Sequence, residues 1–89
     1  MALLDDVIGN VTAAMVDRGL WDDTLMIFSS DNGGPENLNS NAANNFPQRG
    51  GKFGSMEGGI RVAAFVSGGY LPRSARGTHC DGMISVADW

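Results

Sequence analysis

The N-terminal part of the chain carries apolar side chains at the spacing of an α-helix. Over residues 3–20 they recur with a period of about 3.6 residues. Asp5 and Asp6 suit the positive N-terminal end of a helix dipole, and Arg18 suits the opposite end. Gly19 stands where a left-handed C-terminal cap is expected. The pattern therefore predicts an amphipathic helix whose apolar stripe consists of Leu4, Val7, Ile8, Val11, Ala14 and Met15.

Two short apolar runs are predicted to be β-strands. Residues 24–29 form a nearly continuous apolar run, which is typical of a strand buried on both faces, as in parallel α/β sheets. This run stops abruptly at Asp31 and Asn32. Residues 60–66 form the second candidate strand, and a pair of glycines closes it.

The connections between these elements complete the predicted order. Residues 31–59 are rich in asparagine and glycine, and a connection this long is usually functional or disordered. Residues 70–81 form another connection. Over residues 83–89 an apolar helical pattern begins without a stop signal, so we expect the chain to be a truncated segment. The order of helix, strand, long loop, strand and helix start predicts the α/β class.

Composition limits the chain to one small domain of soluble type. It has 89 residues, of which 43% are hydrophobic and 18% charged. A small chain with 13 glycines normally needs a disulfide, a metal or a partner to hold it together. Cys80 is the single cysteine, so an intrachain disulfide is excluded.

The distribution of charge and hydropathy argues against a nucleic-acid surface, a membrane span and a signal peptide. The net charge is −4 and the charged residues are scattered, which argues against a nucleic-acid surface. No apolar run approaches the roughly 20 residues needed to span a bilayer. The N-terminus also lacks the basic start and apolar core of a signal peptide.

Asp31 and Asn32 are the first candidates for chemistry, because they directly follow a predicted strand. In open α/β sheets ligands bind beyond the carboxyl ends of the strands. Carboxylate and amide oxygens are hard donors that suit Ca²⁺ or Mg²⁺ better than zinc. The alternative is a turn, since Asn-Gly is a strong hairpin signal, although no second apolar strand follows at once. Local residues leave both interpretations open.

Lys52 is the second candidate, because two glycines precede it. Glycines allow backbone N–H groups to approach an anion while the ammonium supplies charge. The segment is not a P-loop, since Phe46 and Phe53 occupy positions where that motif has Gly and Ser or Thr. The alternative is a surface lysine in a loop.

Other polar residues are interpreted as structural or incidental. Glu57 and Arg61 flank a glycine pair that permits a bend into the next strand. His79 and Cys80 are adjacent and cannot by themselves fill a four-ligand zinc site. Asn10 begins a glycosylation sequon, which matters only in a secreted protein.

Taken together, the motifs resemble the sulfatase family, and most closely its arylsulfatase B-like (N-acetylgalactosamine-4-sulfatase-like) branch. The likeness runs from about Asp5 to Trp89 and corresponds to a middle-to-late slice of a sulfatase catalytic domain. It rests on the order of three strings, Ser30-Asp31-Asn32-Gly33-Gly34, Arg49-Gly50-Gly51-Lys52 and Met56-Glu57-Gly58-Gly59-Ile60-Arg61-Val62.

The resemblance implies a metal-dependent hydrolase of sulfate esters on an alkaline-phosphatase-like α/β fold. In this family the residues that match Asp31 and Asn32 bind the active-site Ca²⁺. The lysine that matches Lys52 contacts the sulfate and is expected to act in catalysis. Relatives are often lysosomal or secreted, which is the expectation for the compartment.

The chain departs from the family pattern at the nucleophile. The family makes a formylglycine from the first residue of Cys/Ser-x-Pro-x-Arg, and neither Cys80 nor any serine here begins that motif. The early Asp pair of the family has no match, because Asp5 and Asp6 fall inside the predicted helix. His79 matches none of the catalytic histidines.

We therefore predict that residues 1–89 are a fragment of a single sulfatase catalytic domain. It would carry part of the calcium and sulfate site of a sulfuric ester hydrolase and be inactive alone. The alternatives are a non-catalytic remnant that binds anions or metals, or part of a phosphate-ester hydrolase of the same superfamily.

Overall fold

The computed structural model describes residues 2–37 and 42–89, which fall into two compact units. One unit combines Met1–Leu25 with Gly68–Trp89. The other is Met26–Ser67, and it contains Asp31, Asn32 and Lys52. The candidate site is therefore built within a single continuous stretch of the chain.

The predicted N-terminal helix is confirmed as α1, which spans Ala2–Asp17. Its C-terminal end has the predicted glycine cap, because Gly19 adopts a φ of 68°. The Gly19 N–H donates to the Val16 carbonyl at 2.9 Å, and the Leu20 N–H donates to the Met15 carbonyl at 2.9 Å. This pair of bonds is the Schellman arrangement, which satisfies carbonyls that the last helical turn leaves unpaired.

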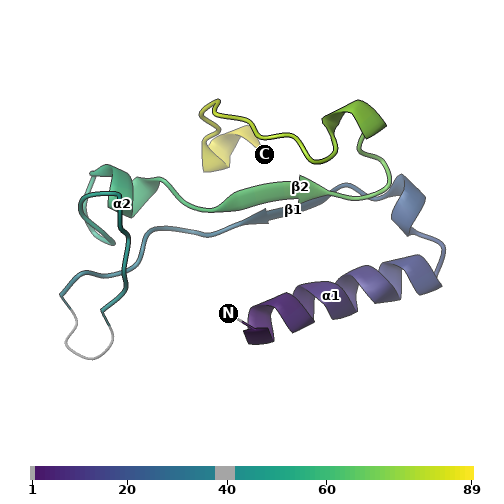
Figure 1. Cartoon of the computed structure of the whole chain (residues 1–89), viewed down its shortest axis with the longest axis horizontal. Helices are drawn as coiled ribbons and strands as arrows, with labels where there is room; N and C mark the ends of the chain where they lie inside the picture. Colours follow the sequence, from purple (N-terminus) through teal and green to yellow (C-terminus); the bar gives the residue numbers. More distant parts are fainter. Residues whose placement is uncertain (1, 38–41) are drawn as a thin grey trace. The chain divides into compact units, whose positions relative to one another are not determined.

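The two predicted strands pair with each other as an antiparallel ribbon (Figure 1). β1 spans Met26–Ser29 and β2 spans Ala64–Ser67. Phe28 lies directly opposite Phe65, and their rings stack with centroids 5.1 Å apart and an interplanar angle of 12°. Aromatic pairs across an antiparallel ladder favour one register, because a slip would separate the rings.

The expectation of a strand buried on both faces in a parallel sheet is wrong. β1 alternates between half-buried and exposed residues, and Ile27 keeps 43% of its surface exposed. Its described sheet has two antiparallel strands. A continuous apolar run shows that side chains suit an apolar environment, but it does not show which element covers them.

The second strand begins later than predicted. Residues 60–66 were expected to be extended, whereas Glu57–Ile60 form the short helix α2 and β2 begins at Ala64. The long connection between the strands is otherwise irregular, as predicted, and its residues 38–41 lie outside the described part of the chain.

The expected helical start near the C-terminus is present as one 3₁₀ turn, η4, over Val86–Asp88. Ser85 accepts a hydrogen bond from the Ala87 N–H at 3.3 Å, and its own N–H donates to the Asp88 carboxylate at 2.6 Å. This reciprocal capping box is typical of a helix N-terminus.

Apolar side chains of the described residues remain accessible to solvent, and none of them is buried. Leu3 and Phe46, for example, are 78% and 85% exposed. Burial of apolar surface is the dominant favourable contribution to folding. Across residues 2–37 and 42–89, no helix is both long and apolar enough to cross a membrane.

We expect the isolated chain to unfold gradually on heating, because its described residues form no buried apolar core that would make unfolding cooperative. The helix signal in circular dichroism, at about 222 nm, should weaken without a sharp transition. A hydrophobic dye should bind already at low temperature. A single steep transition with no dye binding would contradict this expectation.

Candidate functional site

The ribbon holds the predicted metal pair between two hydrogen bonds that extend its ladder. Beyond the last strand pair, the Ser30 N–H donates to the Ala63 carbonyl at 3.1 Å. Further along, the Gly33 N–H donates to the Gly59 carbonyl at 2.9 Å. Asp31–Asn32 lies between these anchors, so its backbone is tied at both ends. Figure 1 shows α2 and the loop before it beyond this end of the ribbon.

Asp31 and Asn32 form a local bend in which part of their polar surface is already used. Asp31 Oδ1 accepts the Asn32 N–H at 2.9 Å, and Asn32 Nδ2 donates to the Gly33 carbonyl at 2.8 Å. Asp31 is exposed and Asn32 is half-buried. These bonds use neither Oδ2 of Asp31 nor Oδ1 of Asn32, and both are hard oxygens of the kind that Ca²⁺ takes.

The tight-hairpin interpretation of Asn32 and Gly33 is wrong. The strand that pairs with β1 is β2, Ala64–Ser67, rather than the residues that directly follow the Asn-Gly pair. The two glycines after Asn32 instead contact distant parts of the loop: Gly33 lies against Gly58, and Gly34 lies against Ala43.

Lys52 is joined to the metal pair through the backbone. Its N–H donates to the Gly34 carbonyl at 3.0 Å, and Gly34 lies two positions after Asn32. The Lys52 side chain is exposed, and its Nζ lies 5.6 Å from the centre of the Phe53 ring. The structure thus brings the two predicted parts of the site together at the level of the main chain.

The join depends on backbone-against-backbone packing among six glycines, which we call the glycine contact: Gly33, Gly34, Gly50, Gly51, Gly58 and Gly59. Its members come from three segments of the loop. A Cβ on Gly33 would overlap the Gly58 carbonyl, and one on Gly51 would overlap the Gly34 carbonyl. Four of them, Gly33, Gly51, Gly58 and Gly59, are buried. From the sequence these glycines are interpreted separately, as aids to an anion or a bend, and no local signal shows that they meet.

Glu57 and Arg61 flank a helical turn, where the sequence predicted a bend into the next strand. Arg61 donates to the Glu57 carboxylate at 3.2 Å across one turn of α2. The Arg61 side chain is 63% exposed and the Glu57 side chain is 60% exposed. An exposed i,i+4 ion pair contributes little to stability, so the backbone packing of Gly58 and Gly59 matters more.

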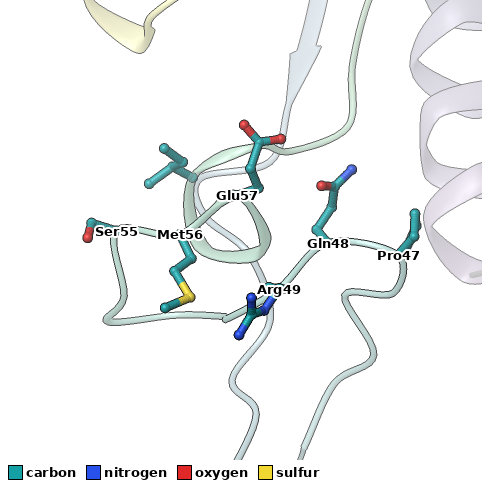
Figure 2. Close-up of a pocket in the computed structure, with 7 residues that line it drawn as sticks. Pro47, Gln48, Arg49, Ser55, Met56 and Glu57 are labelled. Atoms are coloured by element: carbon teal, nitrogen blue, oxygen red, sulfur yellow. The ribbon is translucent and has the colours of Figure 1, made fainter.

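The same loop also forms an open cavity of about 540 Å³. Figure 2 shows the Arg49 and Met56 side chains extending to one side, while the Glu57 carboxylate points to the other. None of the three predicted site residues lines this cavity. Its lining consists of Pro47, Gln48, Arg49, Ser55, Met56, Glu57 and Ile60.

The remaining polar candidates show no metal geometry. In residues 2–37 and 42–89, no three or more His, Cys, Asp or Glu side chains come together as a metal site. His79 lies 2.9 Å from the Asp81 carboxylate with both groups exposed, and Cys80 is an exposed free thiol. Any metal at Asp31 and Asn32 would therefore need ligands from elsewhere.

Comparison with known proteins gives one consistent result. The sulfatase family model matches residues 1–89. Arylsulfatase J of Mus musculus is 37% identical over 89 residues, which cover 100% of this chain and 14% of the mouse protein. The chain thus spans about one seventh of the length of this relative. No solved structure matches the chain.

We expect Gly33→Ala to open the glycine contact, because the new methyl group would overlap the Gly58 carbonyl. Overpacking of this kind costs about 1–3 kcal/mol, which corresponds to a rise in the open population of roughly fivefold to a hundredfold. Trypsin should therefore cleave after Lys52 roughly fivefold to a hundredfold faster, relative to cleavage after Arg18 in the same chain.

Gly82→Ala is the control for this experiment, since it lies outside the helices and, beyond its chain neighbours, its added methyl group would meet only the exposed Cys80 Sγ, at the ordinary contact distance of 3.4 Å. Its ratio of cleavage at Lys52 to cleavage at Arg18 should equal that of the unmodified chain. An unchanged ratio in Gly33→Ala would show that the glycine contact does not hold the loop.

Proposed function

The chain belongs to the sulfatase family, and from this membership we propose that it supplies part of the calcium and sulfate site of a sulfuric ester hydrolase. The observation that carries the proposal is the hydrogen bond from the Lys52 N–H to the Gly34 carbonyl. This bond joins the segment with the candidate metal ligands to the segment with the candidate sulfate ligand.

Asp31 and Asn32 are proposed as the metal ligands of this chain. Their available oxygens are a carboxylate and an amide carbonyl, a donor set that fits Ca²⁺ or Mg²⁺. When bound, the metal would supply Lewis-acid polarisation of the sulfate and orient it. The residues themselves contribute negative charge and a backbone position tied by Ser30 and Gly33 on either side.

Lys52 is proposed to bind the sulfate group and to stabilise charge on it during transfer. It is the only lysine of the chain, and its side chain is exposed rather than paired with a described carboxylate. Fixed cations aimed at a transferring anionic group are among the larger contributions to catalysis. The Gly34 bond fixes the main chain of Lys52, so the side chain starts from a defined position.

The site in this chain is incomplete, and we propose that the chain alone is inactive. Ca²⁺ takes 6–8 oxygen ligands, of which Asp31 and Asn32 supply about two or three. The sequence contains no Cys/Ser-x-Pro-x-Arg motif to provide the nucleophile. We propose that the remaining groups come from outside these 89 residues, and the 14% of the mouse relative that the chain covers supports this.

For substrate class we propose an aryl or sugar sulfate ester. The name of the mouse relative, an arylsulfatase, supports this class. The arylsulfatase B-like branch and a lysosomal or secreted location are proposed on the same family grounds.

A hybrid enzyme tests the proposal, in which residues 1–89 replace the matching segment of mouse Arylsulfatase J. The hybrid should hydrolyse a chromogenic aryl sulfate, whereas the isolated chain should not. Asp31→Ala and Lys52→Ala should each lower kcat/KM about 100-fold or more, because each removes a charge that acts on the reacting group.

Asp23→Ala is the matched control, since Asp23 is an exposed carboxylate in a 3₁₀ turn. This variant should keep the activity of the unmodified hybrid. The proposal would be wrong if a folded hybrid kept full activity in both the Asp31 and the Lys52 variants. Turnover by the isolated chain would overturn the view that its site is incomplete.

A further inference from the structure

The Asn45 side chain makes three hydrogen bonds, all to backbone groups of the glycine contact. Its Oδ1 accepts the Gly34 N–H at 2.8 Å. Its Nδ2 donates to the Gly34 carbonyl at 2.8 Å and to the Gly50 carbonyl at 3.1 Å. The carboxamide thus pairs with both polar groups of Gly34, as a neighbouring strand would, and reaches a second segment as well.

The three partners determine which way the carboxamide faces. Two carbonyl oxygens need a donor, and one N–H needs an acceptor. An amide supplies two N–H donors on one side and an oxygen acceptor on the other, so every partner of Asn45 is satisfied. Turned by 180°, the side chain would place its oxygen against two carbonyls and its NH₂ against an N–H. No other side chain of this length offers the same combination.

The segments that Asn45 joins carry the proposed site residues. Gly34 lies two positions after Asn32, and Gly50 lies two positions before Lys52. The Gly34 carbonyl also accepts the Lys52 N–H at 3.0 Å. One side chain therefore connects the backbone near the metal ligands with the backbone near the sulfate ligand.

The space around Asn45 leaves little room for the two segments to shift. A Cβ on Gly51 would lie 2.9 Å from Asn45 Nδ2, closer than real Cβ contacts. Asn45 itself is half-buried, so water competes less for its bonds than at an exposed side chain. The carboxamide therefore fits closely between the two segments, beside the direct bond from the Lys52 N–H to the Gly34 carbonyl.

We propose that Asn45 is a positioning residue, which sets the distance between the Asp31–Asn32 pair and Lys52. The inference rests on the proposed function of those residues and assigns none of the chemistry to Asn45. Its importance follows from the sensitivity of catalysis to small displacements, since an error of about 1 Å can cost about 100-fold in rate.

The test uses the hybrid enzyme with Asn45→Ala and Asn45→Asp. Alanine removes all three bonds, and aspartate keeps the acceptor but loses both donors. Both variants should lower kcat/KM for a chromogenic aryl sulfate about tenfold, as loss of groups that orient metal ligands does. Both should also raise the Ca²⁺ concentration for half-maximal activity of chelator-treated enzyme about tenfold.

Asn44→Ala is the matched control, because Asn44 is the exposed neighbour and its Oδ1 accepts only the Phe46 N–H, at 2.9 Å. Its kcat/KM and Ca²⁺ dependence should equal those of the unmodified hybrid. A merely structural role for Asn45 would reduce the yield of folded enzyme but leave the kcat/KM of the folded fraction and its Ca²⁺ requirement unchanged. That result would overturn the inference.

Amide hydrogen exchange separates failure of this inference from failure of the proposed function. Asn45→Ala should speed exchange in peptides that contain Gly34 and Lys52, relative to Asn44→Ala, whether or not the hybrid is active. Unchanged exchange in both peptides would overturn the inference. An inactive hybrid that is folded would instead count against the proposed function, and the exchange result would still decide the role of Asn45.

Discussion

The structure of the candidate site depends on the absence of Cβ atoms where three loop segments meet. Gly33, Gly51 and Gly58 bring peptide groups together more closely than any other residue permits. At that distance the Gly58 N–H reaches the Arg49 carbonyl at 2.8 Å, and the backbone polar groups satisfy one another. The glycines therefore replace side-chain packing as the means by which this part of the chain holds its shape.

This constraint explains how an irregular loop can hold the two parts of the candidate site close together. The ribbon of β1 and β2 ties the chain on one side of Asp31, and the glycine contact ties it on the other. Asn45 adds the only described side chain that bonds to both Gly34 and Gly50. Polar side chains can then stay exposed for ligands while their backbones are held.

The apolar side chains play a smaller part in the described residues. The Phe28–Phe65 pair supports the ribbon, yet Phe65 keeps 41% of its surface exposed. The order of this chain therefore rests more on backbone hydrogen bonds than on a core. Such bonds contribute only about 0.5–1.5 kcal/mol each.

The sequence by itself determined the existence of α1 and its Gly19 cap and the approximate places of both strands, because each follows from local spacing. The candidate site residues were instead proposed from the family resemblance, since their local pattern left other interpretations open. Sulfatase family membership was likewise legible in the order of three short strings. The tertiary structure alone decided that β1 pairs antiparallel with β2, that the glycines meet, and that Asn45 bridges them. These contacts join residues far apart in the chain. Their cause is complementary backbone geometry, which residue type and spacing do not encode locally.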